Sequence, residues 1–314
     1  MKVLSLFDGI SVLRCALGDR KVEYLASEID KHAIAVSKKN YPDITHIGDV
    51  SKVKDISDVY LLCGGSPCQD LSIAKKDRKG LDGERSGLFW EWVRIWKESK
   101  PTYFILENVA SMPKADRDII TAELGVEPIM INASLVSAQN RKRLFWTNIP
   151  VVGLPVDRGI RVKDILEPNA EEDERMTTTD GKAFCLKARY SGATEKHSVE
   201  TKQSTMVRFT PSKGKTKGAV KVGFIGEGEQ YGQGGQAHRV YSPEGKTPTL
   251  GSGGCGLIQE ETKIRKLTPL ECERLQGLPD KYTEGVATTH RYKCLGNAFN
   301  CEVIKFILSF MPTH

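Results

Sequence analysis

The strongest constraint on the fold of this chain is a regular alternation of strand and helix patterns over its first 150 residues. Strand-like apolar runs occur at 2–7, 22–30, 44–50, 59–63 and 102–109, and the segments "PIMINASLV" and "RLFWTNI" follow. Helical patterns separate several of these runs, and the aromatic stripe of residues 86–99 is as expected for a helix packed on a sheet. The alternation predicts an α/β fold with a doubly wound, mainly parallel sheet.

The regularity fades between about 151 and 262 and then returns. The middle stretch is rich in glycine but keeps aromatic and branched apolar residues, which favours short strands joined by turns over a flexible linker. In "RKLTPLECERLQGLP", Thr268 and Glu271 predict a capping box at the start of a helix. The segment 295–310, "LGNAFNCEVIKFILSF", is expected to form a Gly-Asn turn and a final apolar helix that docks on the first domain.

The formal net charge of +6 is concentrated in one segment. Residues 182–222 hold ten Lys and Arg against two Glu, whereas the rest of the chain is slightly acidic. Lysines that neutralise phosphates release counterions and so drive binding to nucleic acid. The segment therefore favours a polyanion-facing surface, with a solvated tether as the alternative.

Composition excludes several classes of protein. No apolar segment has the length needed to cross a bilayer, and the N-terminal "MKVLSLFDGI" lacks a signal-peptide pattern, so a cytoplasmic location is expected. The eight cysteines are scattered singly, without a CxxC pair, which argues against a metal site and against a disulfide framework. A length of 314 residues allows one large domain or two of ordinary size.

The turn "FDGIS" after the first strand predicts a cofactor crevice. Gly9 lets the backbone approach a ligand at the start of a helix. Glu28, 19 residues further on at the end of the second strand, suits the hydroxyl groups of a ribose, and Asp49 suits an adenine amino group. A full G-x-G-x-x-G motif is missing, so the pattern favours an adenosine cofactor other than a dinucleotide.

A second group of residues has the character of a reaction centre. Cys68 follows the fourth strand and Glu107 lies in the fifth, and the carboxyl ends of parallel strands meet at one edge. The segment "QNRKR" adds Gln139, Arg141 and Arg143. The ordinary alternatives are a small buried thiol for Cys68, an N-cap or a salt bridge for Glu107, and a surface pair for the arginines. Together, however, the residues place a thiol in a proline-constrained turn beside an acid and two guanidiniums.

In their order along the chain these segments resemble the cytosine carbon-5 DNA methyltransferases. The resemblance rests on "GGSPCQDLS", "ENV", "QNRKR", "RKLTPLECERLQGLPD" and "LGNA", with "FDGIS", "EID" and "GDV" fitting the cofactor motifs. It covers both ends of the chain, and overall length is similar to that of a compact bacterial or phage enzyme. It implies a Rossmann-like fold, S-adenosyl-L-methionine as the cofactor, double-stranded DNA as the substrate and base flipping of the target cytosine.

The resemblance also implies a role for each reactive residue. The Cys68 thiolate would add to carbon 6 of cytosine, Glu107 would contact ring nitrogen 3, and the activated ring would accept the methyl group at carbon 5. Arg141 and Arg143 would favour the thiolate, and Arg143 would also bind the carbonyl oxygen of the base. No residue is identified as the base that removes the carbon-5 proton.

Further residues are carried over by matching motif or by charge. The cofactor-binding residues implied are Phe7, Asp8, Gly9, Ile10, Ser11, Glu28, Ile29, Asp49, Val50, Pro67, Asn297 and Ala298. The DNA-binding residues expected are Gln69, Ser72, Lys75, Lys76, Arg78, Lys79, Arg85 and Gln139, most of them in a polar segment that fits a mobile lid. Ser11 stands where many members have a second glycine, and Ala298 where serine or glycine is common.

The expected domain division follows from the same comparison. Residues 1–165 with 290–314 would form the catalytic domain, 166–262 a smaller, loop-rich target-recognition domain, and 263–289 a connecting hinge. We expect a monomer that does not associate with a membrane. A cognate restriction endonuclease is expected as a partner that acts separately.

Three alternative functions remain beside this prediction. A transfer-RNA cytosine methyltransferase on the same fold usually carries a Cys-Phe-Thr tripeptide, which is missing here. An inactive DNA-binding homologue is disfavoured because all the reactive residues are present. A thiol hydrolase built on Cys68 would need a positioned histidine, and none of the six histidines lies in a loop that clearly faces Cys68.

Overall fold

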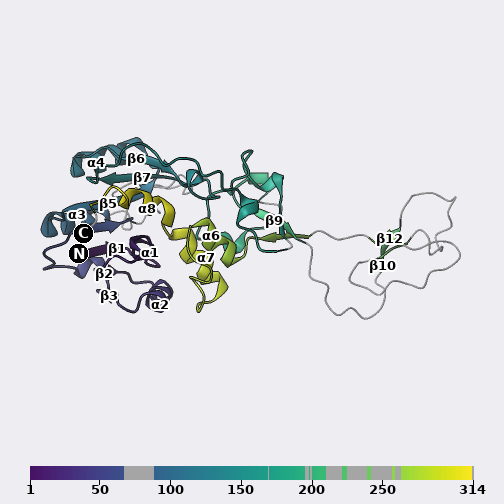
Figure 1. Cartoon of the computed structure of the whole chain (residues 1–314), viewed down its shortest axis with the longest axis horizontal. Helices are drawn as coiled ribbons and strands as arrows, with labels where there is room; N and C mark the ends of the chain where they lie inside the picture. The colour runs from purple at the N-terminus through teal and green to yellow at the C-terminus, as the bar shows by residue number, and fades with distance from the viewer. Residues whose placement is uncertain are drawn as a thin grey trace.

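The computed structural model is built around one large sheet with helices on both faces (Figure 1). It describes residues 1–66, 88–168, 170–194, 198, 200–209, 221–224, 239–241, 257–258 and 263–312. Cys68 and the predicted lid residues 69–87 lie outside the described residues. Within the described part of the chain, no helix is long and apolar enough to span a membrane.

The large sheet has seven strands in the order β3-β2-β1-β4-β5-β7-β6. Its strands are β1 (Lys2–Leu6), β2 (Glu23–Ser27), β3 (Thr45–His46), β4 (Leu61–Gly64), β5 (Tyr103–Val109), β6 (Ile129–Asn132) and β7 (Lys142–Thr147). Neighbouring strands pair in parallel from β3 through β2, β1 and β4 to β5. Strand β7 runs antiparallel to both β5 and β6. The predicted doubly wound, mainly parallel sheet is confirmed.

The helices follow the strands as the sequence pattern predicts, with one exception. They are α1 (Val12–Leu17), α2 (Lys31–Asn40), α3 (Leu88–Ser99), α4 (Lys114–Leu124), α6 (Pro269–Leu275), α7 (Thr288–Asn297) and α8 (Cys301–Leu308). The expected Gly-Asn turn at 296–297 is wrong, because both residues end α7, a helix that the weakly amphipathic sequence of 288–297 did not indicate.

Alternation along each strand supplies two separate apolar cores. Leu4 and Leu62 point to the face that α3 and α4 cover with residues such as Trp92. Val3 and Leu61, one position before each, point to the opposite face, which α1 and α8 cover. Because successive strand residues face opposite sides, a strand buried on both faces must be apolar at every position, as β4 is. The docking of the final helix on the first domain is confirmed.

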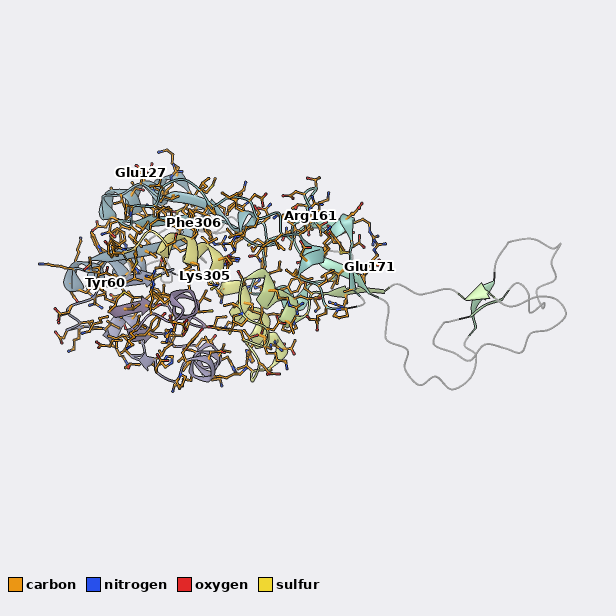
Figure 2. All side chains as sticks on the ribbon, in the orientation of Figure 1. Tyr60, Glu127, Arg161, Glu171, Lys305 and Phe306 are labelled. Carbon is orange, nitrogen blue, oxygen red and sulfur yellow. The ribbon has the colours of Figure 1, made fainter. Side chains whose placement is uncertain are left out.

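Two small sheets lie outside the large one. One joins β8 (Ala170–Glu172), β9 (Met206–Phe209) and β13 (Lys263–Lys266), and the other joins β10 (Lys221–Phe224), β11 (Arg239–Tyr241) and β12 (Leu257–Ile258). The middle region thus contains the short strands that its sequence predicts. Figure 2 shows Arg161 and Glu171, both of the middle region, at one end of the side-chain-filled body, with Tyr60 at the opposite end.

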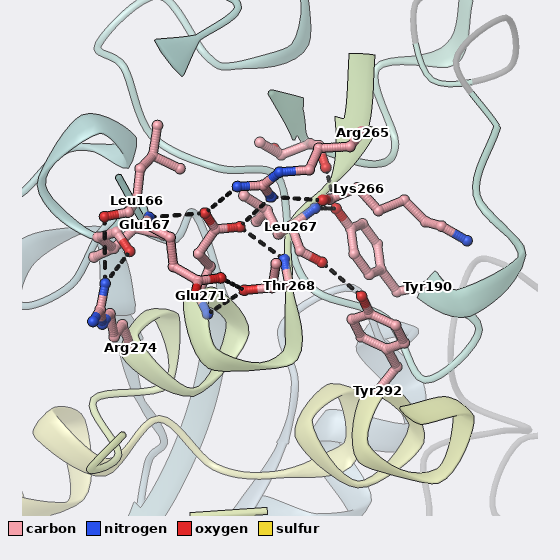
Figure 3. Close-up of polar contacts among 12 residues, drawn as sticks. Leu166, Glu167, Tyr190, Arg265, Lys266, Leu267, Thr268, Glu271, Arg274 and Tyr292 are labelled. Atoms are coloured by element: carbon pink, nitrogen blue, oxygen red, sulfur yellow. Dashed lines mark hydrogen bonds and ion pairs between the residues drawn. The ribbon is translucent and has the colours of Figure 1, made fainter. Parts of the chain in front are cut away.

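A polar joint connects the middle region to α6 (Figure 3). Glu271 is fully buried, and its carboxylate accepts two hydrogen bonds from the Arg265 guanidinium at 2.7 and 2.8 Å. The predicted capping box is present: the Thr268 hydroxyl accepts from the Glu271 amide, and the Glu271 carboxylate accepts from the Thr268 amide. A buried carboxylate needs such bonds, because an unpaired charge in the interior is strongly destabilising.

Two tyrosines extend this joint toward the large sheet. The Tyr190 hydroxyl accepts a hydrogen bond from the Leu267 amide, and the Tyr292 hydroxyl donates to the Leu267 carbonyl at 2.7 Å (Figure 3). The two rings meet edge to face with centroids 5.3 Å apart. Tyr292 lies midway along α7, so the helix that carries Asn297 contacts the middle region there through Tyr190.

The backbones of α7 and of the middle region approach each other tightly at Gly296. A Cβ atom added there would lie 2.3 Å from the Ala188 nitrogen and from the Lys187 carbonyl carbon. These are backbone atoms, which cannot rotate aside. Only glycine allows α7 to touch the segment 187–188 at this point.

Replacing this glycine tests the contact. Gly296→Ala should lower the free energy of unfolding by about 3 kcal/mol, because overpacking against backbone forces the two segments apart. Gly192→Ala is the matched control, since a Cβ at that position meets nothing within 4 Å. Chemical denaturation of both variants measures the difference. Equal stabilities would show that α7 is not held against the middle region in this way.

Candidate active site

A cavity of about 490 Å³ opens at the carboxyl ends of the parallel strands. Its walls come from the β1–α1 turn, the ends of β2, β4 and β5, the start of β7 and the end of α7. Parallel strands that diverge at a switch point leave a crevice here, which explains the position. The predicted residues that line it are Phe7, Asp8, Gly9, Ile10, Glu28, Ile29, Asp49, Val50, Glu107, Arg141, Arg143, Asn297 and Ala298.

The turn after β1 has an unusual backbone conformation. Phe7, Gly9 and Ser11 have φ angles of 54°, 60° and 60°, all in the left-handed region. The turn is held from outside: the Asp8 amide donates to the Ser27 carbonyl at 3.0 Å, and the Gly9 amide donates to the Glu28 carboxylate at 2.8 Å. The end of β2 therefore fixes the turn that lines the cavity.

Two carboxylates at the rim are held by backbone amides. Glu28 accepts from the Gly9 amide through Oε2 and from the Ile29 and Asp30 amides through Oε1, each at 2.8 Å. Asp49 accepts from the Ser51 amide at 2.9 Å, and this hydrogen bond holds the pKa of Asp49 below its usual value. Both groups are therefore oriented acceptors at the ends of neighbouring strands.

Asp8 is the most perturbed acid of the cavity wall. Its side chain is 7% exposed, and its carboxylate accepts from the Tyr24 hydroxyl at 2.6 Å and from the Ser11 hydroxyl at 2.5 Å. Burial raises the pKa of Asp8 from 3.8 to about 6, against the opposing effect of these hydrogen bonds. The sequence motif implied that Asp8 contacts the cofactor, but it did not indicate that the carboxyl is buried.

Glu107 and Arg143 form an ion pair inside the cavity. The Arg143 Nε lies 2.8 Å from Glu107 Oε1, with side-chain exposures of 16% and 12%. A Cβ at Gly65 would approach Glu107 Oε2 to 2.9 Å, so the glycine at the exit of β4 leaves room for the carboxylate. The Arg143 Nη1 also donates to the Lys142 carbonyl at 2.9 Å, so the guanidinium is held in place beside the carboxylate in the cavity wall.

Arg141 has a different environment from Arg143. It is 4% exposed and donates to the carbonyls of Leu186 at 3.1 Å and Ala298 at 2.9 Å. Its Nη1 also lies 3.5 Å from the Cys185 sulfur. Burial opposes ionisation of Cys185, but the two guanidiniums outweigh it and lower the pKa of this thiol. Arg141 thus ties β7 to the middle region and to the end of α7.

Some predicted site residues do not line the cavity. Ser11 is fully buried behind the turn, and Gln139 is fully buried, with no hydrogen-bond partner for its amide group within the described part of the chain. Further predicted residues lie outside the described residues, namely Pro67, Cys68, Gln69, Ser72, Lys75, Lys76, Arg78, Lys79 and Arg85.

The structure adds wall residues that the sequence did not single out. Lys293 pairs with Asp30 at 2.6 Å and joins α7 to the start of α2 at the cavity rim. Ser66 is another wall residue, and its hydroxyl accepts a hydrogen bond at 3.3 Å from the side chain of Asn108, which follows Glu107 in the strand but does not itself line the cavity. The motif "ENV" could have indicated Asn108, whereas Lys293 could not be found because α7 was not predicted.

Fold and cavity together define a doubly wound α/β protein with a ligand crevice at the carboxyl ends of its parallel strands. Over 99% of this chain and 97% of the other, the structure is similar to that of Entamoeba histolytica methyltransferase EhMeth, with a TM-score of 0.63 and 13% identity. It is also similar to S. pombe Dnmt2 methyltransferase, with a TM-score of 0.54, 17% identity and coverage of 98% and 97%. At these identities the likeness concerns the fold.

Sequence comparison identifies the family. The profile of the C-5 cytosine-specific DNA methylases matches residues 1–312, so the chain belongs to that family and is a cytosine-5 DNA methyltransferase. Type II methyltransferase M.HhaI of Haemophilus parahaemolyticus is 28% identical over 98% of this chain and 93% of its own length. Type II methyltransferase M1.ScrFI of Lactococcus lactis subsp. cremoris is 32% identical over 99% and 77%.

The buried acid gives the protein a specific pH dependence. Because the pKa of Asp8 is raised to about 6 in the folded state, the native protein binds an extra proton between about pH 4 and 6, and this contribution to stability is lost as pH rises through 6. The unfolding free energy of the wild type should fall by about 3 kcal/mol relative to Asp8→Asn between pH 4 and pH 7. Urea denaturation of both proteins across this range measures it, and a constant difference would contradict the assignment.

Proposed function

We propose that this methyltransferase uses S-adenosyl-L-methionine and modifies a flipped-out cytosine through a transient bond to Cys68. The observation that carries the proposal is the Glu107–Arg143 pair, which lies in the same cavity as the turn after β1. One cavity thus offers a place for an adenosine cofactor and, beside it, an acid and a cation suited to a pyrimidine edge.

The residues present fit the proposed cofactor. The Glu28 carboxylate would accept hydrogen bonds from ribose hydroxyls, and Asp49 would accept from the adenine amino group. Ile29, which is 74% exposed, offers an apolar face for the adenine ring. The turn at Phe7–Ile10 and Asn297 would hold the amino-acid portion. When bound, the cofactor would supply an electrophilic methyl group on a positively charged sulfur.

Glu107 and Arg143 would activate the base. Cytosine carbon 5 by itself reacts poorly with an electrophile. Addition of a thiolate at carbon 6 would convert the ring into an enamine, in which carbon 5 is nucleophilic. Glu107 would hold a proton at ring nitrogen 3 as electron density moves there, and Arg143 would stabilise negative charge on the carbonyl oxygen. The Cys68 thiolate would form the bond to carbon 6, and loss of the carbon-5 proton would later release it.

The remaining surfaces would serve the duplex. We propose that the basic residues of 182–222 and those of 75–85 contact phosphates, so that the cytosine can leave the stack and enter the cavity. The catalytic domain would comprise 1–165 and 290–314, the target-recognition domain 166–262, and the hinge 263–289. The polar joint of α6 supports a connecting role for 263–289, because Leu267 is hydrogen-bonded to Tyr190 of one part and to Tyr292 of the other.

The relatives support a setting for this activity. The relatives from Haemophilus parahaemolyticus and Lactococcus lactis are named type II methyltransferases. A relative from Bacillus phage rho11s is named an orphan methyltransferase and is 28% identical over 85% of this chain. We infer a role in restriction–modification in the cytoplasm of a bacterial or phage-infected cell, as a monomer, with a restriction endonuclease acting separately.

The acid and the cation can be tested separately from folding. Glu107→Gln and Arg143→Lys should each lower kcat by about a hundredfold or more, while the thermal midpoint changes little. Glu107→Gln removes the titratable carboxyl, and Arg143→Lys keeps the charge but loses the planar guanidinium that can bind the carboxylate and the carbonyl oxygen of the base together. Transfer of tritiated methyl groups to duplex DNA measures kcat. Glu127→Gln, an exposed glutamate remote from the cavity, is the matched control. Full activity of Glu107→Gln would overturn the role of the acid.

A further inference from the structure

Ser11 occupies a backbone position that an L-residue rarely adopts. Its φ and ψ angles are 60° and 41°, the left-handed helical region, and it is the N-cap residue of α1. A Cβ in this conformation crowds the following carbonyl, which is why glycine usually fills such positions. The residue nevertheless sits in the turn whose neighbours line the cavity, so its conformation must be stabilised from elsewhere.

A buried chain of polar groups supplies this stabilisation. The Ser11 hydroxyl donates to Asp8 Oδ2 at 2.5 Å and lies 2.6 Å from the Ser37 hydroxyl of α2, and Ser37 in turn lies 3.4 Å from His46 Nε2. Both serines and Asp8 are buried. The chain therefore runs from the cavity wall, through the interior, to the end of β3.

The proton positions in this chain follow from the carboxylate. Because Asp8 only accepts when ionised, the single hydroxyl proton of Ser11 points to Asp8, and the Ser37 hydroxyl must donate to Ser11. His46 must then donate from Nε2. Its Nδ1 is buried with no partner among the described residues, as fits an unprotonated nitrogen. Every hydrogen bond thus has one direction, set by the charge on Asp8.

The backbone of the turn is held on its other side as well. The Ser11 amide donates to the Asp8 carbonyl at 3.1 Å, and the Tyr282 hydroxyl donates to the Ile10 carbonyl at 2.8 Å. Neither of these backbone contacts fixes the Ser11 side chain. Among the described residues, its hydroxyl is held by the bonds to Asp8 and Ser37. A hydroxyl held between a carboxylate and a second hydroxyl cannot move when the backbone attempts to leave the left-handed region.

We propose that Asp8 is a positioning residue that, through the Ser11 hydroxyl, holds the cofactor turn in the left-handed conformation that glycine would otherwise provide. The inference rests on the proposed cofactor for its effect on binding, but its effect on the turn exists without any ligand. It assigns Asp8 and Ser37 a function in shaping the cavity, beyond direct contact with the cofactor.

Ser11→Ala and Ser11→Gly separate this role from simple burial of a polar network. Both variants leave Asp8 without its serine partner, but only alanine keeps the Cβ that makes the conformation unfavourable. Hydrogen exchange of the amides of 9–12, measured without cofactor, should therefore be about tenfold faster in Ser11→Ala than in Ser11→Gly. Titration calorimetry with S-adenosyl-L-methionine should give a Kd about tenfold higher for Ser11→Ala than for Ser11→Gly.

The role of Asp8 is tested in both backgrounds. Asp8→Asn should speed exchange of the 9–12 amides, measured without cofactor, when Ser11 is present, and should have little further effect on this exchange when combined with Ser11→Gly. Thermal midpoints identify any variant that fails to fold. If Asp8→Asn fails to fold, Ser37→Ala takes its place, because it breaks the hydrogen-bond chain at the next member. We expect Ser37→Ala to speed exchange of the same amides when Ser11 is present.

The outcomes separate this inference from the proposed cofactor. Equal exchange rates in Ser11→Ala and Ser11→Gly, or the same effect of Asp8→Asn in both backgrounds, would overturn the positioning role. If exchange follows the expectation but S-adenosyl-L-methionine binds to none of the proteins, including the wild type, then the positioning role stands and the cofactor proposal fails.

Discussion

The antiparallel pairing of β5 and β7 is the constraint on which the active site depends. Its register sets Glu107 opposite Phe145 and Val109 opposite Arg143, so Glu107 and Arg143 lie diagonally on one face of the sheet. Side chains in such positions are close enough to interact. A slip of one residue would send Arg143 to the other face and leave the carboxylate buried without its cation.

The same strand also organises the connection to the middle region. Arg141, two residues before Arg143, leaves the strand at its start and is bonded to carbonyls of Leu186 and Ala298. Gly296 lets α7 approach the backbone of 187–188. The segment of excess positive charge therefore begins at residues that are packed directly against the cavity wall. This arrangement connects the proposed duplex-binding region through packed backbone to the residues that would receive the flipped base.

Much of this architecture could be predicted from the sequence, because it depends on local patterns. Strand and helix alternation indicated the sheet, the capping box of Thr268 and Glu271 indicated α6, and motif order indicated the family. Interactions between distant segments could not be predicted. The burial of Gln139, the Asp30–Lys293 pair and the raised pKa of Asp8 all depend on which segments meet in three dimensions. Helix α7 was missed because it is held by tertiary contacts more than by its own amphipathic pattern.

The central claim is that the Glu107–Arg143 pair prepares a cytosine for attack by one particular thiol. A duplex with 5-fluorocytosine at the target position should arrest the reaction, because carbon 5 then carries fluorine in place of the proton whose loss would release the cysteine. Incubation with S-adenosyl-L-methionine, denaturation and peptide mapping by mass spectrometry locate the attached nucleotide. The account predicts an adduct on Cys68 in the wild type and its loss in Glu107→Gln. An adduct on Cys185, or one that forms equally well without the Glu107 carboxylate, would contradict it.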